Sequence, residues 1–74
     1  MPKLSPVSSK KLIKILNKFG FQKIRQKGSH LRMEHPDGRK TTIPMHPGEN
    51  VGKGLLHKIL KDTQIAPEVF QKYK

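Results

Sequence analysis

The first part of the chain has the apolar spacing of an amphipathic helix. Apolar side chains recur three or four residues apart between residues 9 and 19, and lysines fill the opposite side. Ser8 and Ser9 precede this stripe and Gly20 follows it, and these residue types favour the start and the end of a helix. The pattern predicts a helix over residues 9–19.

The middle of the chain has the pattern of strands and turns. Residues 21–26 predict a strand with Ile24 turned toward the core, and "GS" at 28–29 predicts a tight turn into a second strand, "HLRMEH". The sequence "PDG" at 36–38 predicts the next turn, because proline presets φ and glycine supplies a positive φ. A third strand, "RKTTIP", is then expected to end at Pro44.

The last part of the chain predicts a second helix and a short third one. Asn50 is the expected N-cap of the second helix, and Pro67 falls in the first turn of the short one. The apolar stripe of the second helix consists of Leu55, Leu56, Ile59 and Leu60, and the side chains of the short helix expected to dock on the core are Val69, Phe70 and Tyr73.

This order of elements predicts an α+β fold. An α-β-β-β-α chain with short turns between its strands favours a three-stranded antiparallel sheet with the helices on one face, followed here by a short C-terminal helix. The chain of 74 residues is long enough for one core, so residues 1–74 are expected to form a single domain with a shallow site at most.

The chain is strongly basic. Its formal net charge is +11, from 16 Lys and Arg against 5 Asp and Glu, and the first 33 residues hold nine basic side chains and no carboxylate. Such an imbalance favours a polyanionic partner, and nucleic acid is expected rather than a membrane because the four aromatics include no tryptophan and are scattered. The absence of cysteine and of a long hydrophobic segment predicts a cytoplasmic location.

Strand parity predicts which way one histidine faces. Successive side chains of a strand alternate between its faces, so Leu31 and Met33 share one face while His30, Arg32 and Glu34 share the other. The apolar pair must face the helices, which turns His30 outward. The same counting places four side chains of the flanking strands beside it: Lys23, Arg25, Lys40 and Thr42.

A histidine among cations suits RNA cleavage. Imidazole takes up and releases protons near neutral pH. RNA carries its own nucleophile, the 2′-hydroxyl, so cleavage needs a base, an acid and cations to stabilise the charge on phosphorus, but no metal ion. From the residues alone, His30 is more often an ordinary polar residue on a strand face than a catalytic group. His35, of opposite parity, is expected to be a turn or edge residue.

Two other kinds of site fit the sequence less well. The histidines at 30, 35, 46 and 57 lack the short paired spacings of metal ligands, so no metal site and no cofactor are expected. The segment "GENVGKG" at 48–54 is one residue too short for a nucleotide-phosphate loop and has Gly54 where serine or threonine is needed. Gly52 and Gly54 either let backbone N–H groups approach a phosphate or, as we expect, allow close packing of the second helix on the sheet.

Several motifs in order resemble the HicA toxin family. They are a Gly-Ser-His turn, a hairpin through "HPDG", the Pro-x-His of "IPMHPG" and a glycine-led helix, and the resemblance covers about residues 8–65. It implies a fold like that of double-stranded-RNA-binding domains, cleavage of mRNA, and neutralisation by a HicB-type antitoxin. By position, Gly28 and Ser29 form the family turn, His30 is the catalytic histidine, and His46 is a second histidine that serves as support or proton partner.

The sequence thus predicts a toxin that is a metal-independent mRNA endoribonuclease with His30 on the open face of its sheet. The alternative is a non-catalytic RNA-binding module of the double-stranded-RNA-binding type. The residues expected to contact RNA are Lys23, Arg25, Lys27, Gly28, Ser29, Arg32 and Lys40.

Overall fold

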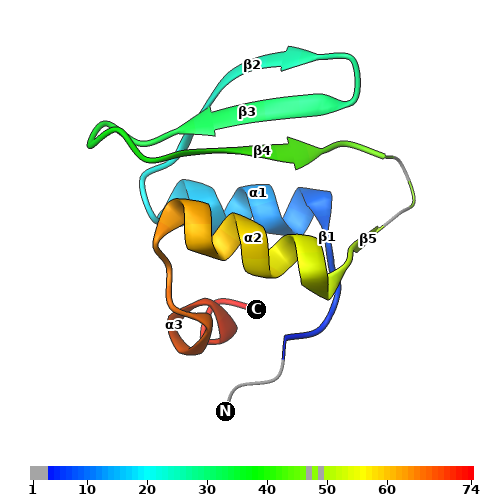
Figure 1. Cartoon of the computed structure of the whole chain (residues 1–74), viewed down its shortest axis with the longest axis vertical. Coiled ribbons are helices and arrows are strands. Elements are labelled where there is room, and N and C mark those ends of the chain that lie inside the picture. Colours follow the sequence, from blue (N-terminus) through cyan, green and yellow to red (C-terminus); the bar gives the residue numbers. More distant parts are fainter. Residues whose placement is uncertain (1–3, 47, 49) are drawn as a thin grey trace.

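The computed structural model describes residues 4–46, 48 and 50–74 of the chain (Figure 1). Its elements, in chain order, are β1 (Val7–Ser8), α1 (Ser9–Lys18), β2 (Gln22–Lys27), β3 (His30–Glu34), β4 (Lys40–Pro44), β5 (Asn50–Val51), α2 (Lys53–Thr63) and α3 (Pro67–Gln71).

The predicted fold class is confirmed. Strands β2, β3 and β4 form an antiparallel three-stranded sheet in that order, and α1 and α2 lie side by side on one side of it (Figure 1). This arrangement is compatible with the α-β-β-β-α order of double-stranded-RNA-binding domains, with α3 added after it. No helix within the described residues is both long enough and apolar enough to cross a membrane.

Helix α1 begins at Ser9, as predicted, and ends at Lys18, one residue before the predicted end, with Phe19 as its C-cap. The Ser8 hydroxyl accepts a hydrogen bond from the Lys11 N–H at 3.1 Å, which caps the helix. Gly20 has a φ of +96°, a conformation that glycine adopts without strain. A Cβ at Gly20 would also lie 2.8 Å from Nε2 of His35, so a side chain there would displace the His35 ring.

The core lies between the sheet and the helices. Leu12 and Leu16 of α1, Met33 of β3, Ile43 of β4 and Leu56 of α2 are all fully buried. The Ser9 hydroxyl, itself buried, donates to the Pro44 carbonyl at 2.8 Å and so ties the start of α1 to the end of β4.

A second, two-stranded sheet joins segments that the sequence did not reveal as strands. Val7 pairs with Val51 and Ser8 with Asn50, antiparallel, so β1 and β5 hold the starts of α1 and α2 together. Asn50 is therefore a strand residue, and its predicted role as N-cap is wrong. Gly52 occupies the N-cap position of α2 and makes no side-chain cap.

The apolar stripes of α2 and α3 are narrower than predicted. Leu55 is 37% exposed, while its three companions in the stripe of α2 are buried. Phe70 of α3 is buried, as expected, but Val69 of α3 and Tyr73, just after the helix, are exposed. The Tyr73 ring packs 4.8 Å from that of Phe19 at the surface instead of entering the core.

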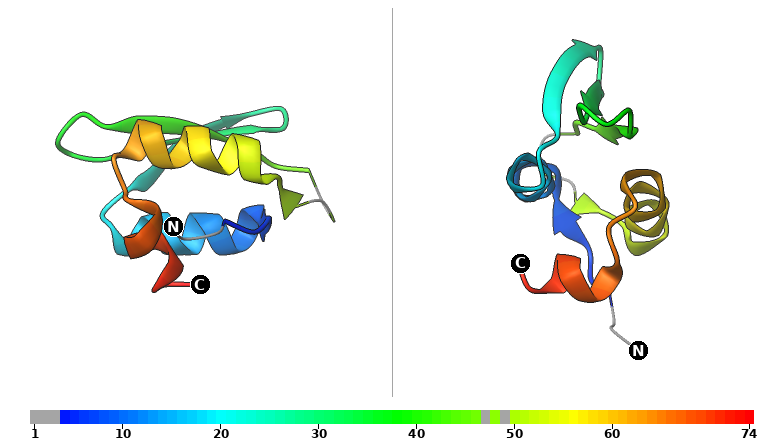
Figure 2. Two further views of the ribbon diagram at one scale, coloured as in Figure 1. Left: turned by 60° about the horizontal axis from the view of Figure 1, so that its bottom comes forward. Right: turned by 90° about the vertical axis from the view of Figure 1, so that its left-hand side faces the viewer.

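Strand β2 departs most from prediction. All six of its residues are exposed, and the strand rises away from the helix layer (Figure 2). Its pairing with β3 shifts between Lys23 and Arg25, which makes Ile24 the extra residue of a bulge. Ile24 is 52% exposed, so the prediction that it turns toward the core is wrong.

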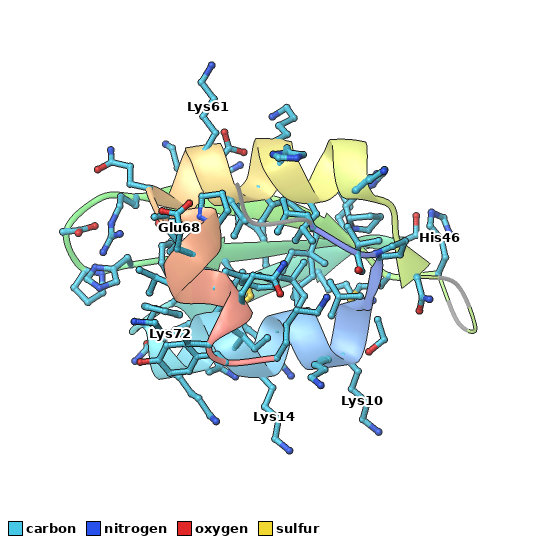
Figure 3. All side chains as sticks on the ribbon, turned by 90° about the horizontal axis from the view of Figure 1, so that it is seen from below. Lys10, Lys14, His46, Lys61, Glu68 and Lys72 are labelled. Atoms are coloured by element: carbon cyan, nitrogen blue, oxygen red, sulfur yellow. The ribbon has the colours of Figure 1, made fainter. Side chains whose placement is uncertain are left out.

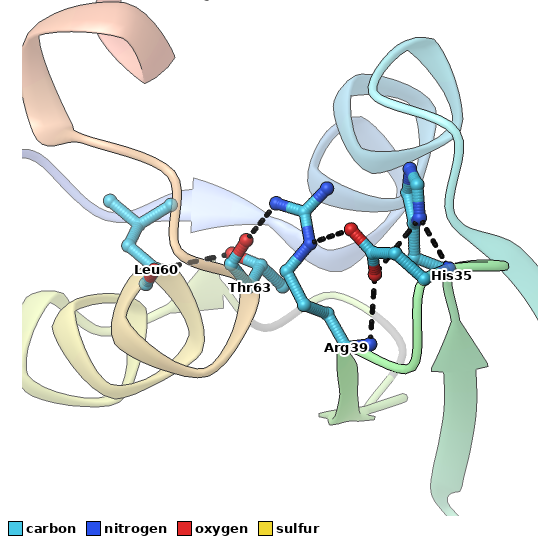
Figure 4. A network of polar contacts seen from close by, with 5 residues as sticks. His35, Arg39, Leu60 and Thr63 are labelled. Carbon is cyan, nitrogen blue, oxygen red and sulfur yellow. Dashed lines mark hydrogen bonds and ion pairs between the residues drawn. The ribbon is translucent and has the colours of Figure 1, made fainter.

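Arg39 clamps the turn between β3 and β4 to the end of α2 (Figure 4). Its Nη1 donates to the Thr63 carbonyl at 2.6 Å, its Nε donates to Oδ2 of Asp37 at 2.8 Å, and its guanidinium lies 5.2 Å from the centre of the Phe21 ring. Gly38, at φ +100°, donates its N–H to the His35 carbonyl and closes the predicted turn.

Removing this clamp is expected to destabilise the fold. Arg39→Ala should lower the free energy of unfolding by about 1.5–3 kcal/mol, because a charge-assisted hydrogen bond to a partly buried carbonyl is lost. Urea unfolding measures the change. The control is Arg25→Ala, an exposed arginine on β2, for which a change within about 0.5 kcal/mol is expected. Equal stabilities for the two variants would contradict the clamp.

The carboxyl of Asp37 makes this turn sensitive to acid. Hydrogen bonds from the Arg39 backbone and side chain, together with the nearby charges of Arg39 and His35, hold its pKa below the usual 3.8. A lowered folded-state pKa means that stabilisation is present above the unfolded-state pKa and is lost as the pH falls through the folded-state value. The melting temperature of the wild type should therefore drop further between pH 5 and pH 2 than that of Asp37→Asn; parallel curves would contradict this assignment.

Candidate nucleic-acid interface

Strand β3 turns His30 outward. Leu31 and Met33 are 3% and 0% exposed against the helices, so the alternate residues His30, Arg32 and Glu34 lie on the opposite face. His30 is exposed at the start of the strand, as parity predicts.

The register of the sheet sets the neighbours of His30. Lys27 of β2 and Pro44 of β4 lie directly opposite His30 on either side, and Arg25 and Thr42 flank Arg32 in the same way. Lys40 lies opposite Glu34. Arg25, Lys40 and Thr42 thus share the open face of the sheet with His30, as predicted, and Lys40 lies toward the other end of β3.

Lys23 lies elsewhere, and its predicted place beside His30 is wrong. It is opposite Met33 in the register and therefore on the helix side of the sheet. It lines a hollow with residues of α1, among them Lys14 and Asn17. The physical reason is the bulge at Ile24, which reverses the facing of every β2 residue before it.

Two shallow hollows meet at His30. The first, of about 400 Å³, runs from the open face over the edge of β4 to α2, and we call it the edge hollow. Its lining consists of His30, Arg32, Lys40, Thr41, Thr42, Pro44, Leu55, Lys58, Ile59 and Asp62. The second, of about 420 Å³, lies between β2 and β3, and we call it the face hollow. Its lining consists of Ile24, Arg25, Lys27, His30, Arg32, Glu34 and Thr42.

The edge hollow contains residues that the sequence did not single out. Leu55, Lys58 and Asp62 belong to α2, and Asp62 accepts from the Thr41 hydroxyl at 3.2 Å and pairs with Lys58 at 3.4 Å. In the sequence, the i, i+4 spacing of Lys58 and Asp62 indicates only an ordinary ion pair on the exposed face of a helix. Only the packing of α2 beside β4 brings them to the site, and no local signal indicates that packing.

The cations of the site differ in how far they are already paired. Nε of Arg32 contacts Oε2 of Glu34 at 3.2 Å, with both side chains about two-fifths exposed. Arg25, Lys27 and Lys40 form no ion pair within the described residues. Three cations around His30 are thus available to an incoming anion, while Arg32 is held in place beside it.

The Gly28-Ser29 turn fixes the position of His30. Gly28 has a φ of +60° at the first central position of this two-residue turn, which favours glycine there. The Gln26 side chain donates to the Gly28 carbonyl at 3.2 Å, and the Met45 N–H donates to the Ser29 carbonyl at 2.6 Å. The turn is therefore tied to the chain that leaves β4.

The other two histidines of the middle segment lie away from His30. His35 is half-buried at the hairpin turn, where its Nδ1 accepts from the Asp37 N–H at 3.1 Å. Its ring packs edge to face with that of Phe21, with the two ring centres 5.1 Å apart. It is a turn residue, as expected. His46 is exposed and lines a hollow with Lys10 and Gln26, separate from the edge and face hollows.

The remaining candidates from the sequence are a metal site and the two glycines at the start of α2. Within the described residues, no group of three or more His, Asp or Glu side chains is arranged to hold a metal ion. A Cβ added at Gly52 or Gly54 would meet nothing within 4 Å, so the expectation that these glycines serve close packing of α2 is wrong.

Comparison with known families identifies the chain. Residues 9–65 match the family described as the HicA toxin of bacterial toxin-antitoxin systems. The chain belongs to the HicA toxin family. It is therefore a toxin of a toxin–antitoxin system, which implies an antitoxin partner. The matched range includes His30, the Gly28-Ser29 turn and His46, whereas α3 lies beyond it. Comparison with curated proteins gives no match.

Substitutions on β3 test the facing of this strand. His30→Ala should change the free energy of unfolding by less than about 0.5 kcal/mol, because an exposed strand residue is removed. Met33→Ala, on the other face of the same strand, should cost about 2–5 kcal/mol through the cavity it leaves. Urea unfolding of both variants checks this contrast, and a large loss for His30→Ala would mean that the imidazole supports the core.

Proposed function

We propose that this HicA toxin is an mRNA endoribonuclease that cleaves single-stranded RNA through the RNA's own 2′-hydroxyl, with His30 transferring the proton. The observation that carries the proposal is an exposed imidazole between two hollows, on a face with three cations that form no ion pair in the described part of the chain. Each hollow is of the size that holds part of a nucleotide chain and is open to solvent, which suits a polymer substrate.

The chemistry needs only groups of the chain, the RNA and water. His30 removes the 2′-hydroxyl proton as general base; the 2′-oxygen attacks phosphorus, and the P–O bond to the 5′-oxygen breaks. A 2′,3′-cyclic phosphate remains, and the 5′-oxygen leaves as an alcohol with a proton taken from water. Water then opens the cyclic phosphate. In this second step the proton moves in the opposite direction, and the protonated imidazole of His30 can serve as the acid.

The neighbouring cations supply electrostatic stabilisation. Negative charge grows on the phosphoryl oxygens as phosphorus becomes pentacoordinate, and preplaced donors favour that state over the ground state. Arg32 is the cation best held for this role because Glu34 fixes its Nε end. Arg25, Lys27 and Lys40 would bind the flanking phosphates, and the Gly28-Ser29 turn would approach the RNA backbone beside them.

We further propose that the antitoxin is of the HicB type and acts by covering this face. An acidic surface over the open sheet would pair with the free cations and bury His30 at the same time. His46 would not take part in proton transfer, because it lines a different hollow.

A cleavage assay tests the proposal. In chelator, the protein should cut an RNA oligonucleotide and leave a 2′,3′-cyclic phosphate or a 3′-phosphate, and a single 2′-deoxy substitution should block cleavage at that position. His30→Ala should lower the rate by about 100-fold or more, the contribution expected of a positioned proton-transfer group. The matched control is His57→Ala, which removes an exposed histidine of α2 away from both hollows and should cut at the wild-type rate.

Three outcomes would contradict the proposal. Cleavage at a 2′-deoxy position would exclude the 2′-hydroxyl as nucleophile. Loss of cleavage in chelator would indicate a required metal ion. RNA that is bound but never shortened, by wild type and His30→Ala alike, would indicate a non-catalytic RNA-binding module.

A further inference from the structure

We propose that a second RNA-binding surface lies between α1 and β2, on the opposite side of the sheet from His30, and that it holds the phosphate backbone of the same RNA. This inference rests on the proposed function in taking RNA as the ligand. It begins with the unexpected place of Lys23, which faces α1 rather than His30.

The surface is a groove between the helix and the strand beside it, which we call the α1 groove. It has a volume of about 490 Å³ and is lined by Lys10, Lys11 and Lys14 of α1 and by Lys23 of β2, with Ser8, Ile13 and Asn17 between them. Lys10 and Lys14 project outward from α1, away from α2 (Figure 3). The groove exists because β2 rises away from the helix layer and leaves the flank of α1 uncovered (Figure 2).

All the charged side chains that line the groove are positive. Helix α1 and strand β2 contain no Asp or Glu. All four lysines of the groove are exposed, and none forms an ion pair within the described residues. Clustered like charges repel one another and destabilise a compact fold, so an uncompensated cluster favours an anionic ligand that relieves the repulsion.

Strand β2 joins this groove to the site of His30. Because of the bulge at Ile24, Arg25 and Lys27 face the His30 side while Lys23 faces α1. The strand is at the edge of the sheet and all its residues are exposed. An RNA strand that leaves the face hollow can therefore pass over β2 and meet basic side chains at each step.

The groove continues toward His46. The hollow that His46 lines shares Ser8 and Lys10 with the α1 groove and also contains Gln26, the other helix-facing residue of β2. His46 thus belongs with the second surface and would contact the RNA backbone there, at a distance from the bond that is cut.

The chemistry of the groove fits a phosphate backbone better than other anionic partners. A membrane surface would require exposed apolar side chains, and those the described residues expose, Ile24, Leu55, Val69 and Tyr73, do not line the groove. Lys10 and Lys14 stand one helical turn apart, about 6 Å along the axis. A row of point charges without bidentate arginine suits a flexible chain of phosphates, which needs no fixed geometry.

A binding measurement in the His30→Ala background tests this inference. The triple variant Lys10→Gln/Lys11→Gln/Lys14→Gln removes charge from the groove and keeps helix-favouring residues. Affinity for an RNA of about 20 nucleotides should fall 10- to 100-fold, and the slope of log affinity against log salt concentration should fall by about 2, since each single-strand phosphate contact contributes about 0.7. Affinity for an RNA of about 5 nucleotides, too short to reach both surfaces, should change much less.

The control is a second triple variant that loses the same number of positive charges from another part of the molecule. Lys61→Gln/Lys72→Gln/Lys74→Gln removes three exposed lysines from α2 and the C-terminal segment, and its affinity for the long RNA should fall less than threefold. Equal losses in the two triple variants would show that only net charge matters and would overturn the inference. So would competition by polyglutamate as effective as that by RNA, which would make the groove a general site for acidic chains.

This test is separate from that of the proposed function. Binding is measured with a protein that lacks His30, so the result does not depend on whether His30 cleaves RNA. Thermal melts of the triple variants show whether each is folded. If the groove triple is unfolded, Lys23→Gln and Lys14→Gln tested singly should each lower the salt slope by about 0.7, and an unchanged slope in both would overturn the inference.

Discussion

The burial of Leu31 and Met33 is the constraint on which the site depends. These two side chains are almost completely removed from water between the sheet and the helices, and burying each contributes about 1.5–3 kcal/mol. A slip of β3 by one residue would expose both and bury His30 and Arg32 instead. The hydrophobic core therefore holds an imidazole and a guanidinium on the open face, and the ladder to β2 and β4 brings Lys27, Arg25 and Lys40 beside them. A chain with so small a core needs no cleft to build a site, because the flat face of its sheet already gathers the charges.

The bulge at Ile24 divides the cations of β2 between two surfaces. Without it, Lys23 and Arg25 would face the same side; with it, Lys23 turns toward α1 and Arg25 toward His30. Since β2 lies beyond the helix layer, neither side of the strand is buried, and both can carry charge. The same bulge interrupts an exposed sheet edge, as edge strands commonly require to avoid pairing with other chains. Arg39 and the hydrogen bond from Ser9 to Pro44 then hold this uneven sheet to the helices at opposite ends of the core.

The sequence predicts the parts of the molecule that depend on local periodicity. The stripe of α1, the alternation of β3 and the glycine turns are each set within a few residues, and they suffice to place His30, Arg32 and Lys40. The sequence predicts β2 as a strand but not the way its residues face, because no residue type marks a bulge, and one extra residue reverses the facing of Lys23. Nor does it predict the β1–β5 pair, which is two residues long and joins segments far apart in the chain. Leu55 and Asp62 reach the edge hollow only through the packing of α2 beside β4, which is a property of the whole fold.

The central claim is that His30 meets the reacting end of an RNA bound on the open face. A structure of the protein with an RNA that carries a 2′-O-methyl group at the scissile nucleotide tests it most directly, because the methyl group blocks attack but keeps the 2′-oxygen in place. The account predicts that a ring nitrogen of His30 lies about 3 Å from that oxygen, the reach of a general base, with Arg32 against the adjacent phosphate. An RNA that lies on the sheet with its scissile sugar away from His30, or that binds only to the helix side, would contradict the account.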